Sequence, residues 1–341
     1  MNKYLDTLYA GRSVYHGELH DHAASGGTSD GKQSLATWIA QMSEQKMDFA
    51  AILDHRQVRH MYLPEWQDGL FIAGTEPGTE ISDSRAKVKG MHYNMLFPHR
   101  DELAKLLAEF PEYEFTGGIE GHFIYPQFTR ERFGQLIDAV KAHGGFFVHP
   151  HPKQVMQSDD PLDYWFRDET GIEVFYNDFD SEFTDANYPL WTALLAKGKR
   201  VFACAGGDKH NNAGTGALTT IYLAEKTSRG FMDQLRHGDF VCGAVGIRMC
   251  IGDTRMGGKC DFTGKQLEVC ISDFHEAFAD RSHKYRADVI TDKGTVCSFC
   301  VDCAAATEFS MDAQNCKFYR IEIVDETIEA RIAIGNPIWN M

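Results

Sequence analysis

The chain contains 341 residues, of which 49 are acidic and 34 are basic, so its net charge is −15. This acidic excess disfavours duplex DNA and other large polyanions, and we expect the partner to be a small, phosphorylated molecule. No apolar run approaches the roughly 18 residues of a membrane-spanning helix, and the first residues lack the apolar run of a signal peptide. We therefore expect a cytoplasmic protein of two domains; its oligomeric state, a homo-oligomer included, is left open.

Residues 1–240 alternate short apolar runs with amphipathic stretches, which is typical of β/α units. The runs at 49–53, 70–74, 144–149, 172–176 and 201–207 are apolar on consecutive positions, as buried parallel strands are. Apolar residues recur at helical spacing in the stretches 34–46, 101–110, 130–143 and 190–198. This alternation predicts an α/β domain with a parallel sheet that is either open or closed into a barrel.

Residues 241–341 have a different texture, with apolar and polar residues alternating at period two and turn residues between the runs. This pattern predicts a small antiparallel β-domain, of the sandwich type. The sequence thus indicates a domain boundary near residue 241.

Nine cysteines without a signal peptide are better interpreted as reduced thiols than as a disulfide framework. Cys297, Cys300 and Cys303 form a C-x-x-C-x-x-C motif, with Cys316 as a fourth candidate ligand for a metal or iron–sulfur site. The alternative is that these cysteines are small apolar residues of an antiparallel strand and its turn.

Histidine and acidic residues gather where the predicted strands end. His20 and His22 are one residue apart, so both rings point to the same side of an extended strand. The same spacing recurs in two later pairs, His149 with His151 and Asp208 with His210. Other acidic and imidazole side chains follow two more strands: Asp54 and His55, and Glu80 and His92. Because the carboxyl ends of parallel strands meet at one edge, we expect one metal centre there. Imidazole together with carboxylate suits Zn, Mn or Fe.

The order of these motifs resembles that of the polymerase and histidinol phosphatase (PHP) family of metal-dependent hydrolases. The motifs that carry the resemblance are GELHDH, SDG at 29–31, ILDH, PGTEIS at 77–82, GMHYNMLF, FFVHPHP, GIEVFYN and GGDKH. The resemblance implies a distorted (β/α)7 barrel with a trinuclear metal centre. The C-terminal segment, with NPIW near its end, resembles β-domains appended to some bacterial PHP-type hydrolases.

Carried over residue by residue, the resemblance implies three groups of ligands. The first metal would be held by His20, His22, Glu80 and Asp208, the second by Glu80, His92 and His149, and the third by Asp30, His55 and His210. Glu80 would bridge two metals. Glu76 is the alternative in the TEPGTE segment, and we prefer Glu80 because PGTEIS fits the family pattern better. Five residues inserted before Asp30 depart from the usual spacing, so a dinuclear centre is the alternative.

Two divalent metals that share a water lower its pKa and provide a bridging hydroxide as the nucleophile. This chemistry fits a small phosphomonoester or phosphodiester, and it also fits an amide or a carbamate ester. Cationic side chains adjoin the ligand motifs at Arg56, Lys153 and Lys209, which favours a phosphoesterase, although each could be a solvated surface charge.

His151 is a candidate general acid, with a further ligand or a supporting residue as alternatives. Glu173 and Asn177, in GIEVFYN, could support the site. The leading hypothesis is a phosphoesterase, the enzyme alternative is an amidohydrolase or carbamate-ester hydrolase on the same centre, and the alternative of another class is a non-catalytic metal- or ligand-binding module.

Overall fold

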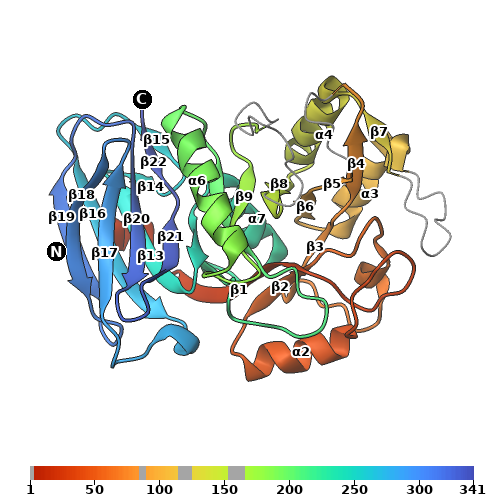
Figure 1. Cartoon of the computed structure of the whole chain (residues 1–341), viewed down its shortest axis with the longest axis horizontal. Coiled ribbons are helices and arrows are strands. Elements are labelled where there is room, and N and C mark those ends of the chain that lie inside the picture. The colour runs from red at the N-terminus through yellow and green to blue at the C-terminus, as the bar shows by residue number, and fades with distance from the viewer. Residues whose placement is uncertain (1–3, 84–89, 114–124, 153–165) are drawn as a thin grey trace.

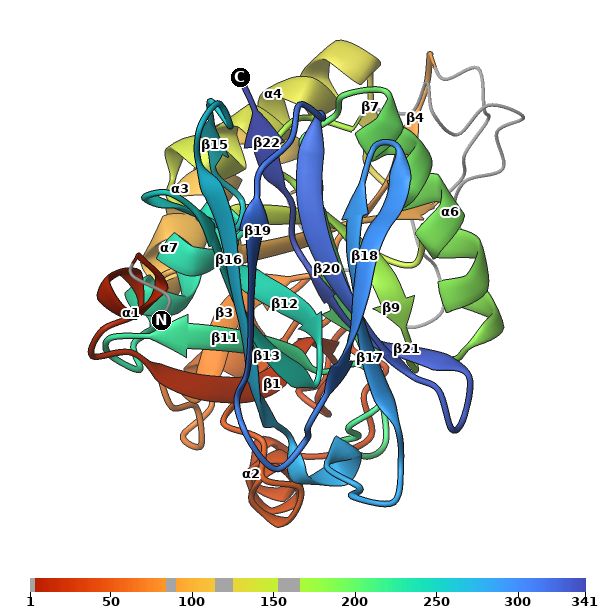
Figure 2. The same ribbon diagram turned by 90° about the vertical axis from the view of Figure 1, so that its left-hand side faces the viewer.

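The computed structural model of the chain describes residues 4–83, 90–113, 125–152 and 166–341. Its main feature is a large mixed sheet whose strands follow the order β10-β9-β8-β6-β3-β2-β1-β11-β12-β21-β20-β17-β18 (Figure 1). Helices surround the half of this sheet that begins at β10, and a second sheet covers the other half (Figure 2). The protein is therefore a mixed α/β structure built on one large sheet with few helices.

The seven strands from β10 to β1 carry the motif residues. They are β1 (Ser13–Asp21), β2 (Phe49–Ile52), β3 (Phe71–Thr75), β6 (Asn94–Phe97), β8 (Phe146–His149), β9 (Gly171–Tyr176) and β10 (Phe202–Gly206). The sequence predicted β2, β3, β8, β9 and β10 within two residues at each end. Almost all of their residues are buried, as continuous apolar runs require.

This half of the sheet differs from a regular repeat of β/α units. β1, β2 and β3 are parallel to one another, and so are β8, β9 and β10. β6 lies between these two groups and is antiparallel to both β3 and β8. The path also continues past β1 into β11, which is antiparallel to it. At the carboxyl ends, the Asp208 amide donates to the His20 carbonyl at 2.7 Å and the His22 amide donates to the Lys209 carbonyl at 2.9 Å. The ends of β1 and β10 are thereby held together.

The longer helices of the described chain begin at side-chain caps. They are α2 (Leu35–Glu44), α3 (Arg100–Glu109), α4 (Arg130–Ala142), α6 (Glu182–Ala196) and α7 (Ser228–His237). The first three match the predicted stretches. α6 starts eight residues before its predicted start. The Ser181 hydroxyl caps it by accepting a hydrogen bond from the Thr184 amide, and the helix includes Pro189, which directly precedes the predicted stretch. Among the described residues, no helix is long and apolar enough to cross a membrane.

Most of the remaining strands are antiparallel to their neighbours, as the alternation after residue 241 predicts, but Lys259–Cys260 pairs in parallel with Ile338–Asn340. The large sheet continues through β11 (Thr219–Leu223), β12 (Phe240–Gly243), β21 (Ala330–Gly335), β20 (Phe318–Asp325), β17 (Tyr285–Thr291) and β18 (Gly294–Val301). A second sheet of β14 (Thr254–Arg255), β13 (Val245–Ile251), β16 (Gln266–Phe274) and β19 (Thr307–Asp312) lies against it. Ile247, Val269, Val289 and Ile321 belong to the apolar core between the two layers. The large sheet crosses the predicted boundary where Val241 pairs with Gly335.

The smaller elements complete the described chain. They are α1 (Leu5–Leu8), the short strands β4 (Gly78–Ile81), β5 (Met91–His92), β7 (Gln127–Phe128), β15 (Lys259–Cys260) and β22 (Ile338–Asn340), and 3-10 turns at Arg59–Tyr62, Pro111–Tyr113 and Glu276–Phe278. β5, β4 and β7 form a separate small sheet beside the large one.

All nine cysteines are free thiols. Cys297 and Cys300 lie on β18, at the edge of the large sheet, and Cys316 is buried next to the Phe318 carbonyl. None of the four cysteines of the predicted motif belongs to a group of potential metal ligands within the described part of the chain. They are therefore residues of the antiparallel strands and turns, the second of the two interpretations of the sequence.

Candidate metal centre

The Glu76 carboxylate lies at the centre of a ring of imidazoles. Glu76 directly follows β3, is fully buried, and contacts histidines from four other segments. Its Oε2 lies 3.1 Å from His20 Nε2, 3.2 Å from His22 Nε2 and 3.1 Å from His55 Nδ1, and its Oε1 lies 2.9 Å from both His92 Nδ1 and His151 Nε2. One buried carboxylate thus faces five basic nitrogens, a set that suits transition metals.

His20 shows which atoms of this ring lack a proton. Its Nδ1 lies 2.7 Å from the buried Glu173 carboxylate, so Nδ1 carries the proton of the neutral ring and Nε2 presents a lone pair. That lone pair faces Glu76 Oε2 at 3.1 Å and Asp208 Oδ1 at 3.5 Å. Neither His20 Nε2 nor Glu76 Oε2 has a hydrogen-bond partner among the described residues. Acceptors that face one another in a buried space are stable only with a cation or an extra proton between them.

A second group lies at the outer side of the ring and includes Asp30. His210 Nδ1 lies 2.8 Å from the Asp208 carbonyl, so its Nε2 also presents a lone pair, 3.0 Å from Asp30 Oδ1. His55 Nε2 lies 3.6 Å from the same oxygen. The ligand atoms of His22, Asp30, His55 and His210 all lie within 4.8 Å of one another. The inserted segment before Asp30 therefore does not keep this carboxylate from the site.

Three groups of potential ligands share members and form one cluster. They are His20, His22, Glu76 and Asp208; His55, Glu76 and His92; and His22, Asp30, His55 and His210. They are similar to the three groups expected from the resemblance, but Glu76 stands where Glu80 was expected, His149 is absent, and His55 and His22 also join the second and third groups respectively. The donor atoms, imidazole nitrogens together with carboxylate oxygens, suit divalent metal ions, and Glu76 belongs to two of the three groups.

The carboxylates and imidazoles of this cluster hold one another in the charged state. Burial alone would raise the pKa of Glu76, but His20, His55 and His92 outweigh this effect and hold the pKa well below its usual range. Burial alone would lower the pKa of His22, but the carboxylates of Asp208 and Glu76 raise it to about 10. Without metals the cluster would thus retain protons, and any bound cation must displace them.

Glu80 lies away from the imidazoles. It occupies the middle of β4, is partly exposed, and its carboxylate accepts a hydrogen bond from the Gln127 side chain. Glu76 occupies the first position after β3, as His22 does after β1. The motif match favoured Glu80, which the structure places outside the three groups of potential ligands.

The two histidines of FFVHPHP point in different directions. His149 is the last residue of β8, and its buried ring packs against Phe147 and Phe166 with centroids 5.0 and 4.7 Å away. Burial lowers its pKa to about 3. His151 lies beyond the strand end with a positive φ of 28°, and contacts Glu76. The rule that residues i and i+2 share a face applies only within a strand, and β8 ends between them.

Two of the three cationic side chains expected beside the metals contact other residues. The Arg56 guanidinium lies 4.7 Å from the centre of the Tyr125 ring, next to the His92 side of the cluster. Lys209 Nζ donates to the main-chain and side-chain oxygens of Asn177 at 2.7 and 2.8 Å. Lys153 lies outside the described residues. Arg56 and Lys209 thus adjoin ligand residues in the chain without joining the ligand groups.

Glu173 and Tyr176, both on β9, contact the ligand side chains. Besides His20, Glu173 accepts the His151 amide at 2.7 Å on its second oxygen. The Tyr176 hydroxyl lies 2.7 Å from Asp208 Oδ2. A Cβ at Gly206 would lie 2.1 Å from the Glu173 carboxylate, so a glycine is required there to admit it. Tyr176 was not among the predicted site residues, since nothing distinguishes a tyrosine in an apolar run from a core residue.

Neither known family models nor curated proteins match this chain, whereas several solved structures do. An amidohydrolase from Chromobacterium violaceum, with bound sulfate and no metal, is 15% identical, with 58% of this chain and 89% of that chain covered and a TM-score of 0.40. A candidate metal-dependent phosphoesterase from Bifidobacterium adolescentis is 18% identical, with 59% and 90% covered and a TM-score of 0.36. A lesion-specific endonuclease from Pyrococcus furiosus is 12% identical, with 66% and 56% covered and a TM-score of 0.42.

These three descriptions all name hydrolytic enzymes, and the last acts on DNA, whereas we expected no large nucleic acid as a partner of this chain. At such similarity the neighbours carry no argument about its reaction. The chemistry of the site rests on its own side chains.

Proposed function

We propose that the protein is a metal-dependent hydrolase whose centre holds two or three divalent ions, Zn, Mn or Fe, and that it cleaves a small phosphate ester. The observation that carries this proposal is the pair of lone pairs at His20 Nε2 and Glu76 Oε2, 3.1 Å apart in a buried space. Glu173 holds one proton on His20 Nδ1, so without a cation the gap must hold an extra proton on Nε2, which a divalent ion would displace. A resident cation removes the conflict.

In this proposal Glu76 bridges ions in the groups that share it. His20, His22 and Asp208 would hold the first ion, His55 and His92 the second, and Asp30 and His210 the third. His151 is assigned as a further ligand rather than as the general acid, because its Nε2 already contacts Glu76 Oε1. When bound, such ions supply a water of lowered pKa and stabilise negative charge on substrate oxygens.

The charges around the cluster favour a phosphate ester over an amide. Arg56 and Lys209 flank the ligand groups and could reach the oxygens of an anionic substrate. The Arg56 guanidinium lies over the Tyr125 ring. An amide or carbamate has no net charge to pair with these cations, so we keep amidohydrolase chemistry as the alternative outcome of the test.

The hydrogen bonds between the ends of β1 and β10 support a distorted barrel of the PHP type. They bring Asp208 next to His20 and His22, so the ligands from the first and last strands of the path can share an ion. In the proposed barrel these seven strands, β6 included, would enclose the cluster.

Metal content per chain, measured by elemental analysis on protein purified without chelator, tests the proposal first. We expect two to three equivalents in the parent and a clear loss in His20→Ala and Asp208→Ala. A panel of phosphate esters, amides and carbamates would then follow. Less than about half an equivalent in metal-supplemented medium would remove the basis of the hydrolase proposal and favour the binding-module alternative, and turnover of amides alone would overturn the phosphoesterase assignment.

A further inference from the structure

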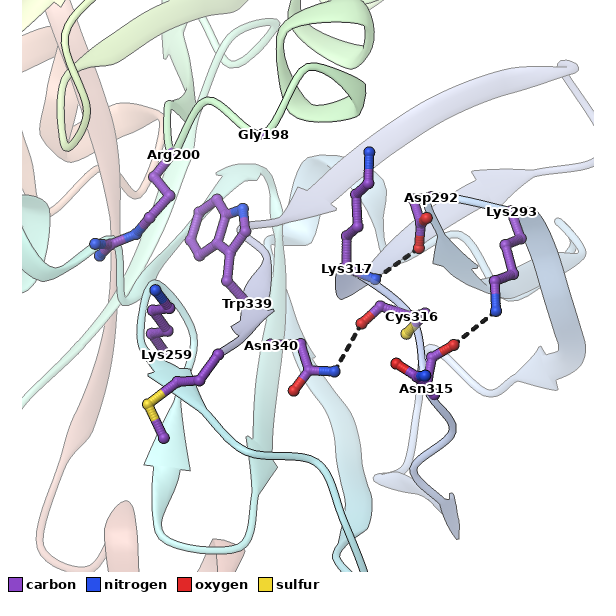
Figure 3. Close-up of a pocket in the computed structure, with 11 residues that line it drawn as sticks. Gly198, Arg200, Lys259, Asp292, Lys293, Asn315, Cys316, Lys317, Trp339 and Asn340 are labelled. Atoms are coloured by element: carbon purple, nitrogen blue, oxygen red, sulfur yellow. Dashed lines mark hydrogen bonds between the residues drawn. The ribbon is translucent and has the colours of Figure 1, made fainter.

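A second polar cavity lies at the opposite end of β10 from the metal cluster, where the loop after α6 meets β15 and β22 (Figure 3). Its volume is about 510 Å³, within the range of sites for small molecules. Arg200 comes directly before β10, whereas Asp208 of the metal cluster follows it. The five residues of the strand alone separate these ends by roughly 17 Å, so the two sites cannot share one ligand group.

Among the charged side chains that line this cavity, cations outnumber carboxylates. They include Arg200, Lys259, Lys293 and Lys317, against the single carboxylate of Asp292. A carboxylate at Met341, which also lines the cavity, would still leave the balance positive. In a chain with 49 acidic and 34 basic residues, four cations around one cavity is the reverse of the average surface. Like charges that gather without counter-charges repel one another, and a bound anion would relieve that repulsion.

Two of these cations, Lys259 and Arg200, are placed to contact such an anion. Lys259 makes no side-chain hydrogen bond or ion pair within the described chain. Arg200 has one ion pair, 3.2 Å to the partly exposed Glu169, and lies 5.6 Å from the centre of the Trp339 ring. Figure 3 shows the two cationic groups approaching each other on one side of Trp339, from the loop after α6 and from β15. A neighbouring cavity of about 530 Å³ is lined by the same two residues, so they stand between both spaces.

The wall behind them also has more donors than acceptors. Arg200 Nε and the Trp339 indole Nε1 are both buried without a hydrogen-bond partner among the described residues. Lys293 and Lys317 each donate to one main-chain carbonyl, those of Asn315 and Ala196, and keep further N–H donors. An occupant rich in acceptor oxygens complements this lining, whereas a cation or an apolar ligand does not.

We propose that this cavity is an anion site that binds the phosphate group of a small molecule between Arg200 and Lys259, independently of the metal centre. Phosphate offers several strong acceptor oxygens, and an arginine fork beside a lysine is a recurrent way to bind it. The site would act as a second ligand site, remote from the centre where hydrolysis is proposed, and it does not depend on that proposed function.

Isothermal titration with inorganic phosphate tests the site, using protein from which metals have been removed by chelation and dialysis. We expect one equivalent to bind the metal-depleted parent. The Arg200→Gln/Lys259→Gln double variant should bind at least about tenfold more weakly, because two charge-assisted contacts are lost. The matched control is Lys197→Gln/Lys199→Gln, which removes the same charge from exposed lysines of the same loop that do not line the cavity.

Circular dichroism would establish that both double variants are folded. Equal weakening in the two variants, or phosphate binding only when metals are present, would overturn the proposal, and so would no binding at 10 mM phosphate, roughly the weakest affinity worth calling a site. A parallel titration with glycerol 1-phosphate separates the two sources of the group. Tighter binding of the ester would assign a phosphorylated metabolite, and equal binding would assign free phosphate.

Discussion

Glu76, at the end of the strands that are mostly parallel, and Glu322, in the antiparallel half, are both buried carboxylates, but their partners differ. Glu322 Oε1 accepts from Arg320 Nε at 2.9 Å and from the Tyr188 hydroxyl at 2.8 Å, and its Oε2 accepts from Arg331 Nε at 2.6 Å. Arginine is always charged, so both oxygens of Glu322 have permanent donors. Glu322 therefore needs nothing from solution to neutralise its buried charge.

Glu76 has no such permanent donors. Its neighbours are imidazoles, which donate or accept according to protonation, and its Oε2 has no hydrogen bond among the described residues. A carboxylate among arginines has permanent charged partners, whereas a carboxylate among oriented imidazoles requires extra protons or bound cations. The difference between the two halves is therefore the main argument that the first is a metal centre.

Among the substitutions that test this difference, Glu76→Gln should have the largest effect. It removes the carboxylate common to two ligand groups, and we expect metal content to fall below one equivalent and hydrolysis to fall roughly a thousandfold or more. Glu80→Gln is the matched control, with the same substitution four residues away and outside the cluster. Elemental analysis and initial rates on the best ester of the panel measure both. Equal effects of the two substitutions would contradict the assignment of Glu76.

The pair Glu76 and Glu80 also shows where sequence reasoning reached its limit. The predicted strands, and the polar side chains at their ends, follow from continuous apolar runs and from the geometry of parallel sheets. Choosing between two glutamates four residues apart required knowing that β3 ends at Thr75 and that β4 starts a separate small sheet. The choice between His149 and His151 likewise depended on where β8 ends, and strand ends are the least predictable part of a strand.

The direction of β6 could not be predicted either. Asn94–Phe97 is a four-residue strand with three apolar residues, and nothing in so short a run says whether it enters the sheet parallel or antiparallel. The hydrogen bonds that close β1 against β10 join residues almost 190 positions apart and depend on this strand order. The period-two pattern of the last hundred residues was more informative, because alternation of buried and exposed residues persists along strands such as Tyr285–Thr291.

Glu322→Gln tests the other side of the comparison. The substitution leaves Arg320 and Arg331 facing an amide instead of a carboxylate, and we expect a loss of roughly 3 kcal/mol in the free energy of unfolding. Metal content should not change, because this cluster is complete without metals. Urea unfolding measures the loss, with Glu326→Gln as the control at an exposed ion pair, where less than about 1 kcal/mol is expected. A fall in metal content with no loss of stability would reverse the roles of the two clusters.

Glu173→Gln should sharpen the role of the residues behind the ligands. The amide can still accept one hydrogen bond but cannot serve both His20 Nδ1 and the His151 amide, so the orientation of both imidazoles is weakened. We expect metal affinity to fall between about tenfold and a hundredfold, with the fold retained. Competition with a chromogenic chelator measures the affinity, and Glu225→Gln on an exposed turn is the control. Unchanged affinity would show that Glu173 serves packing alone.

His16 offers the finest test, because it lies on the same strand as His20 and its pKa shifts in the opposite direction. Burial alone would lower the pKa of His20, but Glu173, Glu76 and Asp208 raise it well above its usual value. Burial lowers the pKa of His16 to about 4, with the neighbouring His275 adding to the effect and Asp273 opposing it weakly. The His16 ring contacts the Thr220 hydroxyl at 2.9 Å and has no carboxylate partner for its side chain within the described residues.

Between the pKa of about 4 in the folded state and about 6.5 in the unfolded state, the unfolded chain binds more protons at His16. Stability from this group is therefore complete above pH 6.5 and decreases as the pH falls, by roughly 1 kcal/mol between pH 6.5 and 5.5. His16→Asn keeps a donor near Thr220 but does not titrate, so the fall in the free energy of unfolding over this interval should be smaller in the variant by that amount. The same fall in both proteins, measured by urea unfolding, would mean that burial does not suppress protonation here. The opposite pKa shifts of His16 and His20 could then no longer be attributed to the carboxylates that face His20.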